Sequence, residues 1–64
     1  MGYQSAVFEL HIESDGGVRR TGLYARIDGG QLSLLESWEW GPFDTSLEIS
    51  QWAWRGVARA LAAH

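Results

Sequence analysis

Residues 38–45 read WEWGPFDT, and residues 46–54 read SLEISQWAW. All four tryptophans of the 64-residue chain lie in this stretch. An alternating, extended pattern ends at Gly41-Pro42, and a pattern of helical period follows it. Each indole ring buries roughly 150–250 Å² when it packs. The placement of these rings therefore determines where so short a chain builds its core.

The second half of this stretch predicts a helix from about residue 46 to residue 62. Thr45 and Glu48 have the spacing of a capping box, in which the N-cap hydroxyl accepts from an amide of the first turn. An apolar stripe at spacings of three and four predicts the face that packs on a sheet. The stripe consists of Ile49, Trp52, Ala53, Gly56, Val57 and Ala60. Its small residues allow a close approach to bulky rings.

Two Asp-Gly-Gly turns divide the preceding residues into three predicted strands, at about 6–14, 18–28 and 31–40. Alternation assigns one face of each strand to the core. These inward positions are Ala6, Phe8, Leu10 and Ile12, then Thr21, Leu23, Ala25 and Ile27, then Leu32, Leu34, Trp38 and Trp40. Two-residue turns keep the faces matched, with either Asp-Gly or Gly-Gly in the central positions.

These patterns predict a single α+β domain over residues 1–64, a three-stranded antiparallel β-meander followed by one C-terminal α-helix on one sheet face (β-β-β-α). Glu36 is the exception, because its parity places a carboxylate among the apolar side chains. A buried unpaired carboxylate is costly, so we expect an arginine partner, with Arg19 on the same face. A β-bulge, or a position that the helix does not cover, would also account for it.

Composition limits the classes of partner. Eight acidic residues outnumber five arginines, there is no lysine, and the net charge is −3, which disfavours nucleic acid. No apolar run approaches the ~20 residues that cross a bilayer, and no signal-peptide pattern is visible. We therefore expect a cytoplasmic protein without a membrane partner, in agreement with the absence of cysteine. The arginine-only basic set suits an accessory protein of a GC-rich bacterium or its phage.

The sequence shows no catalytic or cofactor-binding constellation. Glu9, His11 and Glu13 form an outward row on the first strand, but a metal would need further ligands from the neighbouring strand, which offers arginine and tyrosine instead. Each Asp-Gly-Gly precedes a strand and not a helix, so neither is a phosphate loop. We expect a non-enzymatic protein with no metal and no cofactor.

The predicted helix carries more apolar surface than one sheet needs. Leu47, Trp54, Ala58 and Leu61 extend this surface around one flank, and we predict that these four residues form a protein interface. A strand edge offers a second route to association. Small domains gain stability from a partner. The sequence thus favours a small acidic interaction module, regulatory or accessory, that forms a homodimer or binds another protein.

The outer face of the second strand supports an alternative function, nucleic-acid binding. Arg20, Tyr24 and Arg26 lie there with Arg19 nearby, and such side chains can stack single-stranded bases. The order of elements is similar to that of the sheet-reading DNA-binding domains of plant transcription factors and integrases. It is also similar to that of the single-strand-binding transcriptional coactivators, although no family motif is matched. Glutamates on the first strand would neutralise the arginines.

Overall fold

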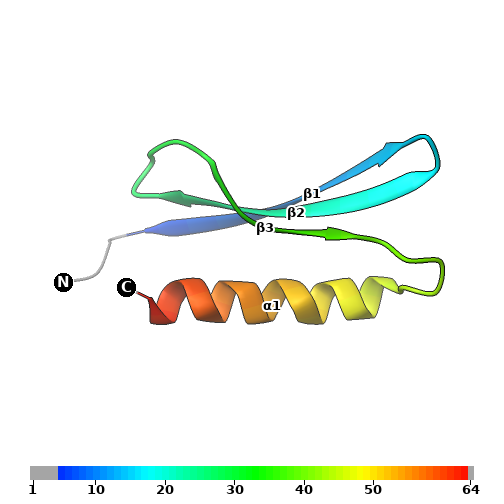
Figure 1. Cartoon of the computed structure of the whole chain (residues 1–64). Helices are drawn as coiled ribbons and strands as arrows, with labels where there is room; N and C mark the ends of the chain where they lie inside the picture. The colour runs from blue at the N-terminus through cyan, green and yellow to red at the C-terminus, as the bar shows by residue number, and fades with distance from the viewer. Residues whose placement is uncertain (1–4, 64) are drawn as a thin grey trace.

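A computed structural model describes residues 5–63 and shows one antiparallel sheet with one helix lying along it (Figure 1). The elements are β1 (Ala6–Asp15), β2 (Val18–Ile27), β3 (Ser33–Glu39) and α1 (Ser46–Ala62). The strand order is β1-β2-β3, so β2 is central. The predicted β-β-β-α fold is confirmed. The helix has the predicted bounds, and β3 is shorter than predicted at both ends.

Both Asp-Gly-Gly motifs form two-residue turns, in different registers. In the first, Gly16 and Gly17 have φ values of 58° and 83°, and Asp15 lies opposite Val18. In the second, Asp28 and Gly29 are the central residues, with φ values of 50° and 75°. Positive φ suits glycine and is tolerated by aspartate, which is why both arrangements are accessible.

Hydrogen bonds of Asp28 and Gly30 hold the second turn with Asp28 and Gly29 at its centre. The Asp28 N–H donates to the Ser5 carbonyl at 3.0 Å, and the Asp28 carboxylate accepts from the Ser5 N–H at 2.9 Å. The Gly30 N–H donates to the Ile27 carbonyl at 2.9 Å and closes the turn. The two bonds between Asp28 and Ser5 extend the contact of β1 with β2 by one further residue pair.

The first half of β3 contradicts the predicted alternation. Ser33 lies opposite Ala25 and Leu34 lies opposite Tyr24, so Leu34 is on the outer face, 56% exposed. The prediction that Leu34 faces the core is therefore wrong. Leu32, also predicted to face the core from within this strand, precedes it.

Two successive one-residue shifts in the pairing of β2 with β3 explain why Leu34 faces outward. They also explain why only the first half of β3 is affected. A two-residue turn alone would place residue 32 opposite Ala25, but Ser33 occupies that position, which inverts the faces. A β-bulge at Leu35 then adds a second shift, so that Glu36 lies opposite Leu23. The second shift cancels the first. Trp38 consequently lies opposite Thr21 and faces the helix, as predicted.

The core lies between β2 and α1 and is small. Its buried members are Thr21, Leu23, Ala25, Ile49, Trp52 and Ala53. Phe8, Trp38, Trp40 and Val57 pack against them and are partly buried. Gly56 is also buried, and a Cβ there would lie 2.5 Å from Leu23 Cδ2, which confirms the close approach of the helix. The Thr45 hydroxyl caps the helix by accepting from the Glu48 N–H at 3.3 Å.

Hydrogen bonds hold the connection between β3 and α1. The Asp44 carboxylate accepts from the Gly41 N–H at 2.7 Å and from Trp38 Nε1 at 3.0 Å. These two bonds, the Gly41 bond foremost, lower the pKa of Asp44 from its ordinary value of 3.8. Trp40 Nε1 donates to the Thr21 hydroxyl at 2.7 Å. The chain thus enters the helix directly beneath β3 and β2.

Candidate protein-interaction surface

The helix covers only part of the apolar sheet face. It packs mainly against β2 and β3, which leaves the same face of β1 open. Leu10 lies opposite the buried Leu23 and Ile12 opposite the buried Thr21, yet Leu10 is 45% exposed and Ile12 is 61% exposed. The sequence assigned these two residues to the correct face, but that face is not buried along β1.

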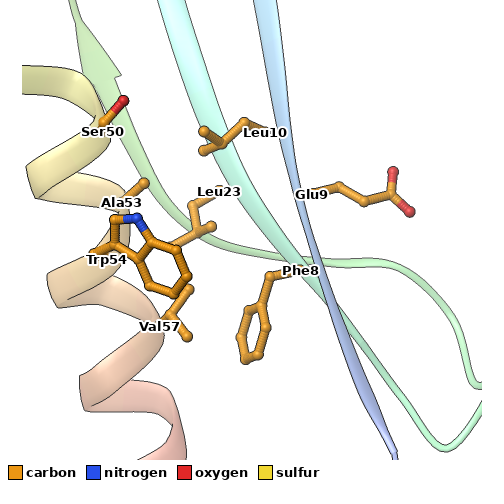
Figure 2. A pocket seen from close by; sticks show the side chains of 8 residues that line it. All are labelled: Phe8, Glu9, Leu10, Leu23, Ser50, Ala53, Trp54 and Val57. Atoms are coloured by element: carbon orange, nitrogen blue, oxygen red, sulfur yellow. The ribbon is translucent and has the colours of Figure 1, made fainter. Parts of the chain in front are cut away.

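An apolar groove of about 380 Å³ separates β1 from α1 (Figure 2). Its apolar lining comprises Phe8, Leu10 and Leu23 from the sheet and Ala53, Trp54 and Val57 from the helix, and Glu9 and Ser50 complete the lining. The apolar side chains converge on the groove, whereas the Glu9 side chain points away from it (Figure 2). We call this groove, together with Ile12 beside it on β1, the open β1 face.

The predicted helix interface only partly coincides with this face. Trp54 is 73% exposed and borders the groove, so its ring lies where a bound partner would contact it. Leu47, Ala58 and Leu61 are exposed on the helix but do not line the groove. The structure therefore joins one of the four predicted interface residues to a concave surface.

Phe8 and Leu10 are the groove residues that sequence reasoning missed, because alternation assigned them to the core. The available signal was the width of a helix. Three strands spaced ~4.8 Å apart, with their side chains, are wider than one helix of ~10–12 Å diameter can cover. One predicted helix for three amphipathic strands therefore implies that one strand keeps an open apolar face.

On the outer sheet face, the residues predicted to bind nucleic acid already contact other groups of the same chain. Arg20 forms an ion pair with Glu39 at 3.2 Å, and Arg26 donates to the Gly30 carbonyl at 2.9 Å. The Tyr24 ring lies against the His11 ring, with centroids 4.5 Å apart. These three predicted residues do share one face.

Arg19 and Glu36 have partners other than those predicted. The Arg19 guanidinium lies over the Trp40 ring, 5.0 Å from its centroid, on the helix side of the sheet and away from Arg20. Glu36 forms its ion pair with Arg59 of the helix. The predicted arginine partner is thus confirmed in kind, but the choice of Arg19 is wrong. The bulge turns Glu36 toward α1, where Arg59 is within reach.

The remaining candidate row on β1 forms a local pair. His11 Nε2 lies 2.8 Å from Glu9 Oε1. Within residues 5–63, no group of three or more histidine, aspartate or glutamate side chains is placed to hold a metal ion. No helix in that range has the length and apolar character to cross a membrane. Comparison of the chain with protein-family models, curated proteins and solved structures finds no match.

Proposed function

We propose that this protein is a small non-catalytic interaction module that binds a protein partner through the open β1 face. The supporting observation is an apolar groove bordered by a tryptophan that is 73% exposed. Exposed tryptophan beside a concave apolar surface is typical of the centre of protein interfaces, where burial of one ring contributes a large share of the affinity. The proposal includes a regulatory or accessory role in the cytoplasm, in agreement with a chain free of cysteine.

The size of the core gives the physical reason for a partner. A chain of this length buries only about 60% of the surface that its unfolded form exposes. Within residues 5–63, the buried side chains are confined to β2 and one helix stripe. A partner that binds only the folded chain stabilises it by mass action, so burial of Leu10, Ile12 and Trp54 would add stability as well as affinity.

Site-specific photo-crosslinking tests this function. A photoreactive phenylalanine analogue replaces Trp54 in the native host, and the same analogue at Arg55 provides the matched control, because Arg55 is also exposed on the helix but lies outside the groove lining. We expect discrete protein adducts from position 54 and none from position 55. Equal labelling from both positions, or no adduct from either, would contradict the proposal.

The alternative, nucleic-acid binding by the outer sheet face, has weaker support because Arg20 and Arg26 are already engaged by Glu39 and the Gly30 carbonyl. Titration of labelled single- and double-stranded DNA at two salt concentrations tests it. The alternative requires salt-sensitive binding that weakens in both Arg20→Ala and Arg26→Ala. Binding that is absent, or unchanged by both substitutions, removes it.

A further inference from the structure

The hairpin turn shows which backbone groups of β1 are free. Asp15 and Val18 flank a two-residue turn, so they form a hydrogen-bonded pair. Every odd-numbered residue of β1 then directs its N–H and C=O toward β2, and the bond from the Asp28 N–H to the Ser5 carbonyl has this phase. The even-numbered residues direct theirs to the open edge. They are Ala6, Phe8, Leu10, Ile12 and Ser14.

We propose that β1 pairs antiparallel with β1 of a second copy, about a two-fold axis at Leu10. The result is a six-stranded sheet with both helices on one face. This inference rests on the proposed function and names the partner. An axis perpendicular to the sheet keeps inward residues opposite inward residues. With the axis at Leu10, Ala6 lies opposite Ser14 and Phe8 opposite Ile12, so all the free groups of β1 are bonded.

Charge on the outer face selects the same register. With the axis at Leu10, Glu9 lies opposite His11 of the second copy, and this pair occurs twice. Moving the axis to His11 places the two His11 residues opposite each other and Glu9 opposite Glu13. Moving it to Glu9 places the two Glu9 carboxylates opposite each other. Like charges directly opposite destabilise a strand pair, so of these three registers the Leu10 register alone places an imidazole opposite each Glu9 carboxylate and bonds all the free groups of β1.

The apolar groups agree with this arrangement. Leu10 and Trp54 line the same groove, so an axis at Leu10 brings one Trp54 from each helix toward it from opposite sides. The two rings would cover the continuous apolar strip that the paired β1 strands form between the helices. Leu10, Ile12 and Trp54, exposed by 45%, 61% and 73% in one copy, are the side chains buried by pairing.

Sedimentation equilibrium from low to high micromolar concentration tests the association. We expect wild type to reach the mass of a dimer and Ile12→Pro to remain monomeric. Proline removes an N–H that faces the open edge, where the β1–β2 ladder does not need it. Ile12→Ala keeps that N–H and should lose less affinity. Circular dichroism checks that each variant is folded. A wild-type monomer at every concentration overturns the inference, whereas Trp54 adducts with a different protein would leave the proposed function standing.

Cysteine mixing tests the register, because the chain has no cysteine of its own. Glu9→Cys and His11→Cys variants are mixed in equal amounts and oxidised. In the Leu10 register, residues 9 and 11 of different copies face each other with Cα atoms about 4.5 Å apart, within disulfide reach. In a dimer of two copies of the same variant, the two cysteines are offset by two residues along the paired strands, and their Cα atoms are about 8 Å apart. We expect mixed disulfides well above one half of all cross-links. A statistical mixture, or an excess of same-variant disulfides, overturns the register.

Discussion

The two edge strands of the sheet flank the same central strand, β2, but lie in different environments. Toward the helix side β1 directs Leu10 and Ile12 and β3 directs Trp38, yet α1 covers β3 and leaves β1 open. The short connection from Trp40 to Thr45 makes the difference, since Asp44 and Thr21 hold the indoles of Trp38 and Trp40 and direct the chain under β3. Chain connection, and not the amount of apolar surface, selects the edge that is buried.

The largest expected contrast between the covered and open regions involves two tryptophans two residues apart. Trp52→Ala removes a ring that is 8% exposed and packs edge-on against Trp38 at 5.7 Å. We expect a loss of about 3–5 kcal/mol of unfolding free energy, which approaches the whole stability of a small domain. Trp54→Ala should change the unfolding free energy of the monomer by only about 0.5 kcal/mol.

Urea titrations of both variants at low protein concentration measure this contrast. At high concentration, Trp54→Ala should also lose the extra stability that wild type gains from association. Similar losses in both variants under dilute conditions would show that the open β1 face already belongs to the core of the monomer.

A smaller effect tests how tightly the covered region is packed. Gly56→Ala gains about 1 kcal/mol of helix propensity, but the added Cβ would lie 2.5 Å from Leu23 Cδ2 and 3.1 Å from Glu36 Oε2. We expect a net destabilisation of about 1–3 kcal/mol. Ala58→Gly, the reverse change at an exposed helix position, should lose about 1 kcal/mol from propensity alone. Thermal unfolding of both variants measures the difference. A stabilised Gly56→Ala would contradict the close approach of helix and sheet.

Charge substitutions on β1 test the pairing at its open edge. His11→Glu places like charges opposite each other twice across the proposed pair, and we expect dimerisation weaker on the order of tenfold. Mixing His11→Glu with Glu9→Arg should produce heterodimers, because each charge then faces its opposite or a histidine. Native mass spectrometry of the mixture counts the species. Homodimers of His11→Glu at wild-type affinity would argue against the pairing of Glu9 with His11.

The smallest effect concerns the connection that anchors the covered edge. The pKa of Asp44 is lowered in the folded state, so its stabilising contribution is present above 3.8 and is lost as the pH falls through the lower folded value. Asp44→Asn should be slightly less stable at neutral pH and should lose less stability on acidification. Urea midpoints of both proteins, measured from neutral pH to below 3.8, give the difference. Parallel curves would show that Asp44 does not contribute to the acid sensitivity.

Local sequence patterns predicted the strands and the helix well, because these elements depend on residues that are close together in the sequence. Alternation defined the buried face of β2, and Thr45 with Glu48 defined the start of α1. The reversed face of Leu34 was not predicted, because the one-residue shift that places Ser33 opposite Ala25 leaves no mark in the alternation of the strand. The bulge at Leu35, which restores the predicted faces, turns Glu36 toward Arg59 of the helix. Helical geometry alone predicted that Trp54 lies outside the core.

Prediction of the groove would have required knowing where the helix lies across the sheet. Phe8 and Leu10 alternate like core residues, and only the lateral position of the helix leaves them open. That position depends on how the connection from β3 folds back, which no periodicity within β1 records. The sequence therefore predicted the helix side of this surface, through Trp54. It did not predict the strand side, because β1 alternates like an ordinary core strand.

The bulge at Leu35 has a consequence for the size of any assembly. A sheet with two regular free edges is divalent, and identical copies can add at both ends to form a fibre. Here the bulge interrupts one edge, while the other is regular over the ten residues of β1. Among the described strands, strand pairing would then be monovalent, and the proposed two-fold pair of β1 strands would use the one regular edge of each copy. Growth by strand addition would end at two chains.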